Sequence, residues 1–122
     1  MKHGFSNSDW ETAKEEARSA MIDRAKLRGM IPYSDLVKTI DSIKLDAHDS
    51  RLFRLLDEIS IEEDELGRGM LSVVVVHKVG DMQPGPGFFE LAKSLGRNTQ
   101  DIEKCWVAEL HRVHAFWSLS KK

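Results

Sequence analysis

A loop of alternating proline and glycine, Pro84 to Gly87, follows an apolar run and precedes an expected helix. A strand, a glycine-containing turn and a helix N-terminus can together bind phosphate through backbone N–H groups. The spacing fits neither G-x-x-x-x-G-K-[ST] nor G-x-G-x-x-G, and proline has no N–H to donate. We therefore favour a rigid corner of the chain, and we keep an anion-binding site at Gly85 and Gly87 as the alternative.

Six acids and no base occur between residues 57 and 65, in the segment DEISIEEDE. The carboxylates of residues 62–65, together with His77, offer ligands for a divalent ion, as in a small metal-dependent hydrolase or nuclease. The other interpretation is a solvated loop or a short helix, capped by Ser60 with Glu63. We favour the second interpretation and predict no metal site.

Two histidines and the single cysteine, His111, His114 and Cys105, fall on the expected last helix. At about 100° per residue the thiol points away from both imidazoles, so the three groups do not form a metal site. Cys105 is predicted to be a small buried residue rather than a nucleophile. Because no G-x-S-x-G or comparable motif is present, we predict no catalytic residue and no cofactor.

Two arginines on the outer side of the expected third helix, Arg51 and Arg54, suggest contact with a macromolecule. The order helix, short strand, helix, helix, strand is the beginning of a winged-helix domain, in which the third helix lies on DNA and a strand hairpin forms the wing. Lys78 and the loop that runs to Gln83 would form that wing. This arrangement makes DNA a possible partner.

Three features favour a protein partner over DNA. The acidic run beside the third helix would repel phosphate, and the net charge of −2 disfavours a protein that coats nucleic acid. The segment GFFELAKSLG also predicts a helix where a wing needs its second strand. The predicted macromolecule-binding surface consists of Arg51, Arg54, Arg68, His77, Lys78 and Gln83.

Two stretches after Met30, PYSDLV and LGRGMLSVVVVHKVGDMQPGPGFFELAKSLG, resemble a pattern found in small bacterial proteins without assigned activity. This resemblance covers most of that part of the chain and implies no catalytic residue. IPYSDLV is also similar to the start of the DNA-binding domain of alkylguanine-DNA alkyltransferases. Their P-C-H-R motif is absent here and Cys105 lies well past its place, so alkyl transfer is not implied.

The elements that must position these residues begin with three helices. Ser8 with Glu11 predicts a capping box at the start of the first helix, which should end near Gly29. After an extended piece around Pro32, a second helix is expected over residues 34–45. A third helix should run from residue 49 or 50 to about 59. Its inward residues are expected to be Leu52, Phe53, Leu55, Leu56 and Ile59.

A strand is expected over residues 70–78, MLSVVVVHK, because its four consecutive valines favour extended structure. The strand lacks alternation, so both of its faces should be covered, and we place it at the centre of the sheet. A fourth helix is expected over residues 87–95. A fifth should run from residue 98 or 99 to 118, with an inward face made of Ile102, Trp106, Leu110, Val113 and Trp117.

The composition is that of one globular domain: 122 residues, 41% hydrophobic and 31% charged. The longest apolar stretch falls well below the about 20 residues of a membrane-spanning helix. The N-terminus lacks the apolar segment of a secretory signal, and one cysteine forms no internal disulfide, so we expect a cytoplasmic protein. Residues 1–6 and 119–122 are expected to fray.

Together these patterns predict a mainly helical α+β domain with about five helices around a small sheet, in which a winged-helix-like arrangement is one option. The favoured function is a non-enzymatic binding module, and the metal-dependent hydrolase is the alternative. A homo-oligomer formed through the aromatic last helix is also open.

Overall fold

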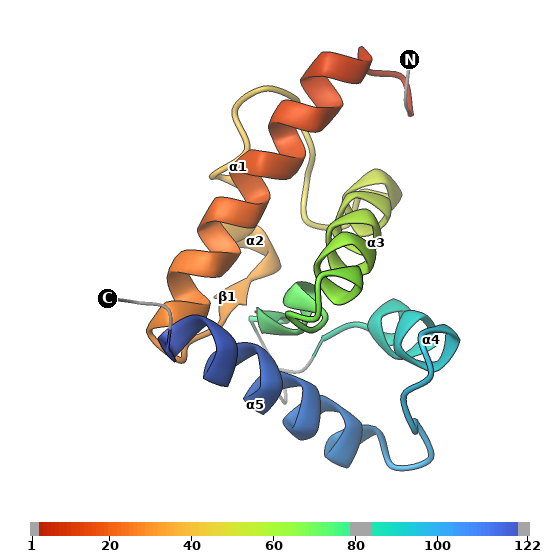
Figure 1. Ribbon diagram of the computed structural model, residues 1–122. Coiled ribbons are helices and arrows are strands. Elements are labelled where there is room, and N and C mark those ends of the chain that lie inside the picture. Colours follow the sequence, from red (N-terminus) through yellow and green to blue (C-terminus); the bar gives the residue numbers. More distant parts are fainter. Residues whose placement is uncertain (1–2, 79–83, 120–122) are drawn as a thin grey trace.

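The computed structural model describes residues 3–78 and 84–119 (Figure 1). These residues form a mainly helical α+β fold with five α-helices and a small sheet of two parallel strands, which confirms the predicted fold class. None of the helices in these ranges combines the length and apolar character that a membrane crossing requires. The elements are α1 (Asn7–Lys26), β1 (Ile31–Pro32), α2 (Tyr33–Val37), α3 (Ser50–Glu65), the 3₁₀ helix η1 (Leu71–Val74), β2 (Val75–Val76), α4 (Pro86–Ser94) and α5 (Ile102–Leu119).

Both ends of α1 differ from the prediction. Ser6, not Ser8, is the N-cap, because its side chain accepts the Asp9 backbone N–H at 3.1 Å. At the other end Arg28, not Gly29, takes the left-handed conformation, with φ of 54°. The buried side of α1 is rich in small residues, which lets α5 and η1 approach closely. It consists of Trp10, Ala13, Lys14, Ala17, Met21 and Ala25.

α2 is shorter than predicted and ends at Val37 instead of residue 45. Ile40 and Ile43, which fall within the predicted helix, are nevertheless buried in irregular chain. The backbone N–H of Ser42 donates to the Glu16 carboxylate at 3.1 Å, so α1 supplies a partner that a longer helix would have supplied internally.

The strand predicted over residues 70–78 is much shorter in the structure. Leu71–Val74 forms the 3₁₀ helix η1, and only Val75–Val76 is extended. β2 pairs in parallel with β1, Ile31 opposite Val75, so a sheet of two strands has no central member. A wing requires an antiparallel hairpin, which the described residues do not contain. The predicted burial is correct, because every residue of η1 and β2 is buried.

α3 continues to Glu65, so the acidic run forms its C-terminal half and is not a solvated loop. Of the two predicted starting residues, Asp49 is the N-cap, since its carboxylate accepts the Arg51 backbone N–H at 2.9 Å. Ser60 and Glu63, predicted as a separate cap, are instead fully buried inside the helix.

α4 matches its predicted range closely and is followed by Gly96, with φ of 91°. α5 begins three to four residues later than predicted. Its most buried side is displaced from the predicted face and contains Cys105, Glu109 and Val113, whereas Ile102 is 50% exposed.

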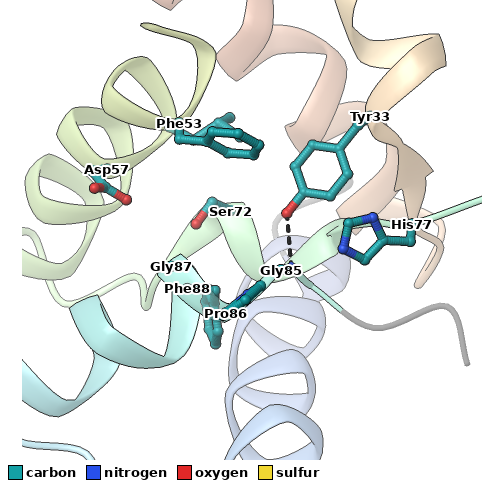
Figure 2. A pocket seen from close by; sticks show the side chains of 10 residues that line it. Tyr33, Phe53, Asp57, Ser72, His77, Gly85, Pro86, Gly87 and Phe88 are labelled. Carbon is teal, nitrogen blue, oxygen red and sulfur yellow. Dashed lines mark hydrogen bonds between the residues drawn. The ribbon is translucent and has the colours of Figure 1, made fainter. Parts of the chain in front are cut away.

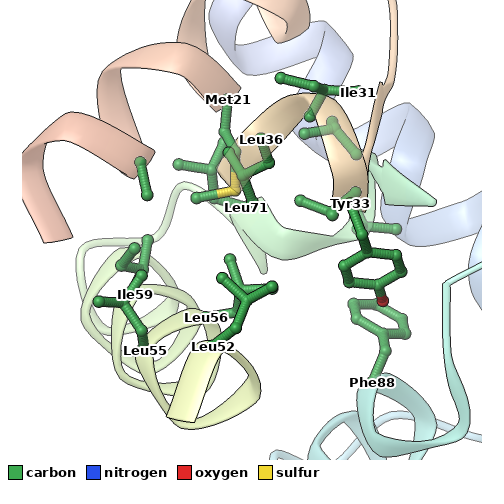
Figure 3. Packing of buried hydrophobic residues seen from close by; sticks show 14 of the residues in the cluster. Met21, Ile31, Tyr33, Leu36, Leu52, Leu55, Leu56, Ile59, Leu71 and Phe88 are labelled. Atoms are coloured by element: carbon green, nitrogen blue, oxygen red, sulfur yellow. The ribbon is translucent and has the colours of Figure 1, made fainter. Parts of the chain in front are cut away.

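The buried residues form one cluster in which η1 lies between α1, α3 and α5 (Figure 1). Leu71 of η1 packs among side chains from α1, α2 and α3, including Met21 and Leu36 (Figure 3). Tyr33 and Phe88 stand at one edge of this cluster, where the packing opens into a hollow.

Candidate functional site

A cavity of about 250 Å³ lies between α3, the end of β2 and the start of α4 (Figure 2). We call it the Tyr33 pocket. Aromatic and aliphatic side chains dominate its lining, and Asp57, Ser72 and His77 supply its polar side chains. Its full lining is Tyr33, Phe53, Leu56, Asp57, Ser72, His77, Gly85, Pro86, Gly87 and Phe88.

Tyr33 connects two walls of the pocket that are distant in sequence, the start of α2 and the residue before α4. It is the first residue of α2, and its hydroxyl accepts the backbone N–H of Gly85 at 3.0 Å (Figure 2). Burial raises the pKa of this hydroxyl, so it stays neutral and able to accept that bond. Its ring also contacts Phe53 edge-on at 5.7 Å and His77 at 5.2 Å between ring centres.

Phe53 was predicted to face inward, but its side chain is 39% exposed. It stands between the Tyr33 pocket and a second hollow of about 310 Å³, which shares Tyr33, Phe53 and His77 with the first. Lys78 and Ser34 line the second hollow. The Ser34 hydroxyl is buried and has no hydrogen-bond partner within the described ranges.

Asp57 is the carboxylate of the Tyr33 pocket. Burial raises its pKa to about 6, an effect that Glu90 reinforces and Arg54 opposes. In the part of the chain that the structure describes, its carboxylate makes neither a hydrogen bond nor an ion pair. A half-buried acid without a direct partner, beside a hollow, is a common feature of functional sites.

The structure brings some of the predicted binding residues to this site. Gly85, Gly87 and His77 line the Tyr33 pocket, and Lys78 lines the second hollow. Arg54 is exposed on α3 and close enough to lower the pKa of Asp57.

Other predicted residues are engaged elsewhere. Arg51 pairs with Asp49 at 2.7 Å, and its guanidinium lies over Phe5. Arg68 pairs with Glu63 at 2.8 Å and lies over Trp117. Neither arginine lines the pocket, and Gln83 lies outside the described residues.

The anion-binding alternative loses its main donor. The Gly85 N–H already donates to Tyr33, and Pro86, at the first turn of α4, has no N–H. The predicted rigid corner agrees with this arrangement, because the bond to Tyr33 ties the loop to α2.

The carboxylates of the acidic run form ion pairs with lysine and arginine side chains from other parts of the chain. Lys14 and Arg18 of α1 bind Glu62, and Arg18 and Arg68 bind Glu63. Among the residues described, no three histidine, cysteine, aspartate or glutamate side chains are grouped as a metal site requires. His77 lines the Tyr33 pocket instead, so the geometry does not favour the hydrolase hypothesis, which stays a prediction.

Of the three candidate residues on α5, His114 and Cys105 are buried. His111 is exposed, whereas His114 is buried with Nε2 2.9 Å from the Gly29 carbonyl oxygen. Because a carbonyl only accepts, Nε2 carries the proton. Cys105 is buried and burial raises the pKa of its thiol, as expected for an unreactive cysteine.

Sequence reasoning missed Tyr33, Phe53 and Asp57 as site residues. The PY dipeptide places Tyr33 directly after an extended segment, and Phe53 lies one residue from Arg54, but no local pattern shows that they face the same hollow. Comparison of the chain with protein-family models, with curated proteins and with solved structures gave no match.

Proposed function

We propose that this protein is a non-enzymatic binding module that captures a segment of a partner protein in the Tyr33 pocket. The observation that carries the proposal is an open, mainly apolar hollow beside the exposed ring of Phe53. Concave apolar sites with a few polar groups are where proteins bind ligands. Aromatic residues in such hollows often contribute most of the energy of protein association.

The charges around the pocket support a protein partner over nucleic acid. Asp57 and Glu90 are acidic, and Arg54 and Lys78 are basic, so the surface has no uniform positive character. Binding to a phosphate backbone depends on several lysines and arginines acting together. A mixed rim around an apolar centre is instead the usual composition of a protein interface.

Ser72, His77 and Asp57 line the same pocket, but their arrangement supports binding rather than catalysis. The Ser72 hydroxyl oxygen accepts a hydrogen bond from the Ser60 hydroxyl at 2.7 Å. A serine nucleophile needs a hydrogen bond to its base, and the base needs one to an orienting group. Within the described residues neither bond is formed between these three side chains.

A peptide-selection experiment tests the proposal. Random peptides displayed on phage are selected on the wild-type protein, and the dissociation constant of a selected peptide is measured by fluorescence anisotropy. Phe53→Ala should weaken binding about 30-fold, since a buried aromatic contact at an interface is worth about 2 kcal/mol or more. Phe116→Ala is the matched control, because Phe116 on α5 is also 39% exposed.

The Phe116→Ala variant should bind the selected peptide as the wild type does. Both variants should keep their melting temperatures within a few degrees, which circular dichroism checks. If Phe53→Ala leaves the affinity unchanged, or if both variants lose it equally, the Tyr33 pocket is not the binding site.

A further inference from the structure

We infer that the Tyr33 pocket selects an alkylammonium group on an apolar stem, such as a lysine side chain of the partner protein. The inference deepens the proposed function and rests on it. It commits the pocket to a cationic occupant, where the proposed function requires only an apolar one.

The walls of the pocket suit such a group. Tyr33, Phe53 and Phe88 line it, and the rings of Tyr33 and Phe53 meet at 74°, so they close two different sides (Figure 2). Ammonium groups bind against aromatic rings because the ring face carries partial negative charge, and cages of several rings recognise alkylated ammonium ions. The methylene stem of the ligand would contact the same apolar surfaces.

The carboxylate of Asp57 adds the charge that an ammonium needs. It lines the pocket together with the aromatic rings, is half-buried, and makes no hydrogen bond or ion pair within the described ranges. A neutral occupant would remove water from this carboxylate without replacing the lost interactions, which is unfavourable. An ammonium would both pair with it and fill the hollow.

The other groups that face Asp57 leave the pocket acidic. Glu90 of α4 adds negative charge, and Arg54, one turn earlier on α3, adds positive charge. Tyr33 of α2 contributes a neutral hydroxyl, and the imidazole of His77 lines the pocket at the end of β2. Lys78 lines the second hollow and not this pocket, so two carboxylates stand against one guanidinium near Asp57, which favours a cation.

The size of the pocket fits one side chain. Its volume of about 250 Å³ lies below the range of about 300–1,000 Å³ that is usual for drug-sized ligands. The alkylammonium can come from a lysine of a protein or from a free small amine, and the experiment separates these sources.

Titration by two-dimensional NMR of the labelled protein tests the inference with four probes. Three are blocked tripeptides that share glycine flanks and carry lysine, Nε-trimethyl-lysine, or the neutral tert-butyl isostere of trimethyl-lysine. The fourth is n-butylammonium. At pH 7 both charged peptides should bind at least about tenfold more tightly than the neutral isostere, with shifts at Tyr33, Phe53 and Gly85.

Two variants identify the source of the selectivity. Asp57→Asn keeps the size of the side chain and should abolish the preference for the charged peptides while the neutral isostere still binds. Glu103→Gln removes an exposed charge on α5, outside the pocket lining, and should change the affinities by less than about threefold. Because the pKa of Asp57 is about 6, the preference should also decline as the pH falls below 6.

Equal binding of charged and neutral peptides would overturn the inference and leave the proposed function intact. So would the absence of shifts at the pocket for every probe, if the library-selected peptide still binds there. If that peptide also fails to contact the pocket, the proposed function fails as well. Binding of n-butylammonium as tight as that of the lysine peptide supports the same chemistry, with a free amine as its source.

Discussion

At the scale of single residues, Asp57 and Asp49 are two carboxylates of α3 with opposite surroundings. Burial raises the pKa of Asp57 to about 6, above the ordinary value of 3.8. Asp49, the N-cap, accepts hydrogen bonds from Arg51, which lower its pKa to about 2. The two groups therefore influence folding in different pH ranges.

Asp57 should make the folded state more stable in acid than at neutral pH. Between about pH 4 and 6 the folded protein binds a proton at Asp57 that the unfolded chain has released, so this contribution to stability is full below pH 4 and is lost as the pH rises through 6. Asp57→Asn cannot ionise, so its melting temperature relative to wild type should rise from pH 4 to pH 7. Differential scanning calorimetry measures this difference, and parallel pH curves for the two proteins would contradict it.

Asp49 contributes in the opposite direction and in a lower range. Its stabilising effect is present above about pH 4 and is lost as the pH falls towards 2. The two ranges do not overlap, so the Asp57 effect can be measured above pH 4 without interference from Asp49.

At the scale of elements, the turn from α3 to η1 depends on two glycines. Gly67 has φ of 76° and Gly69 has φ of 88°, and both values favour glycine over any other residue. Their surroundings differ. A Cβ on Gly67 would meet no atom within 4 Å, whereas a Cβ on Gly69 would lie 3.1 Å from both the Glu109 carboxylate and Val113.

Gly69→Ala should therefore destabilise the protein more than Gly67→Ala. Each substitution forces alanine into a left-handed backbone conformation, which destabilises the folded state by about 1 kcal/mol. Gly69→Ala also forces buried neighbours apart, so its total should reach about 2–3 kcal/mol. Urea denaturation of both variants gives the two values, and equal losses would show that α5 adjusts freely to the extra methyl group.

The extents of the elements show what local patterns can predict. The start of α3 at residue 49 or 50 and the end of α4 near residue 95 were predicted correctly, because caps act within a few residues. The end of α3 was not predictable locally, because Lys14 and Arg18 of α1 bind its last turns. The run from Leu71 to Val76 was correctly predicted as buried, but only Val75–Val76 is a strand, since burial on all sides is compatible with either backbone.

At the scale of the whole molecule, Arg97 links α3 to α5. Its guanidinium binds Asp64 of α3 at 2.6 Å and Glu109 of α5 at 2.9 Å. Glu109 is 2% exposed and also accepts the backbone N–H of Met70 at 2.8 Å, just before η1. These contacts raise the pKa of Arg97, which keeps its charge at any working pH. One buried carboxylate thus connects three parts of the fold.

Arg97→Ala should lower the free energy of unfolding by about 3 kcal/mol, because it leaves the buried Glu109 without its main cationic partner. Arg112→Ala is the matched control. Arg112 lies 3.8 Å from the same carboxylate but is 59% exposed, so its loss should change stability by less than about 1 kcal/mol. Guanidinium denaturation measures both, and equal effects would contradict the role given to Arg97.

The sequence by itself determined that the chain is mainly helical, which residues start several helices, and that the valine run is buried. These properties follow from side-chain periodicity and from caps, which act over a few residues. Only the tertiary structure decided the length of the strand, the pairing of the acidic run with α1, and the Tyr33 pocket. The pocket joins residues about fifty positions apart, Tyr33 and Gly85, and such contacts depend on packing that no local pattern encodes.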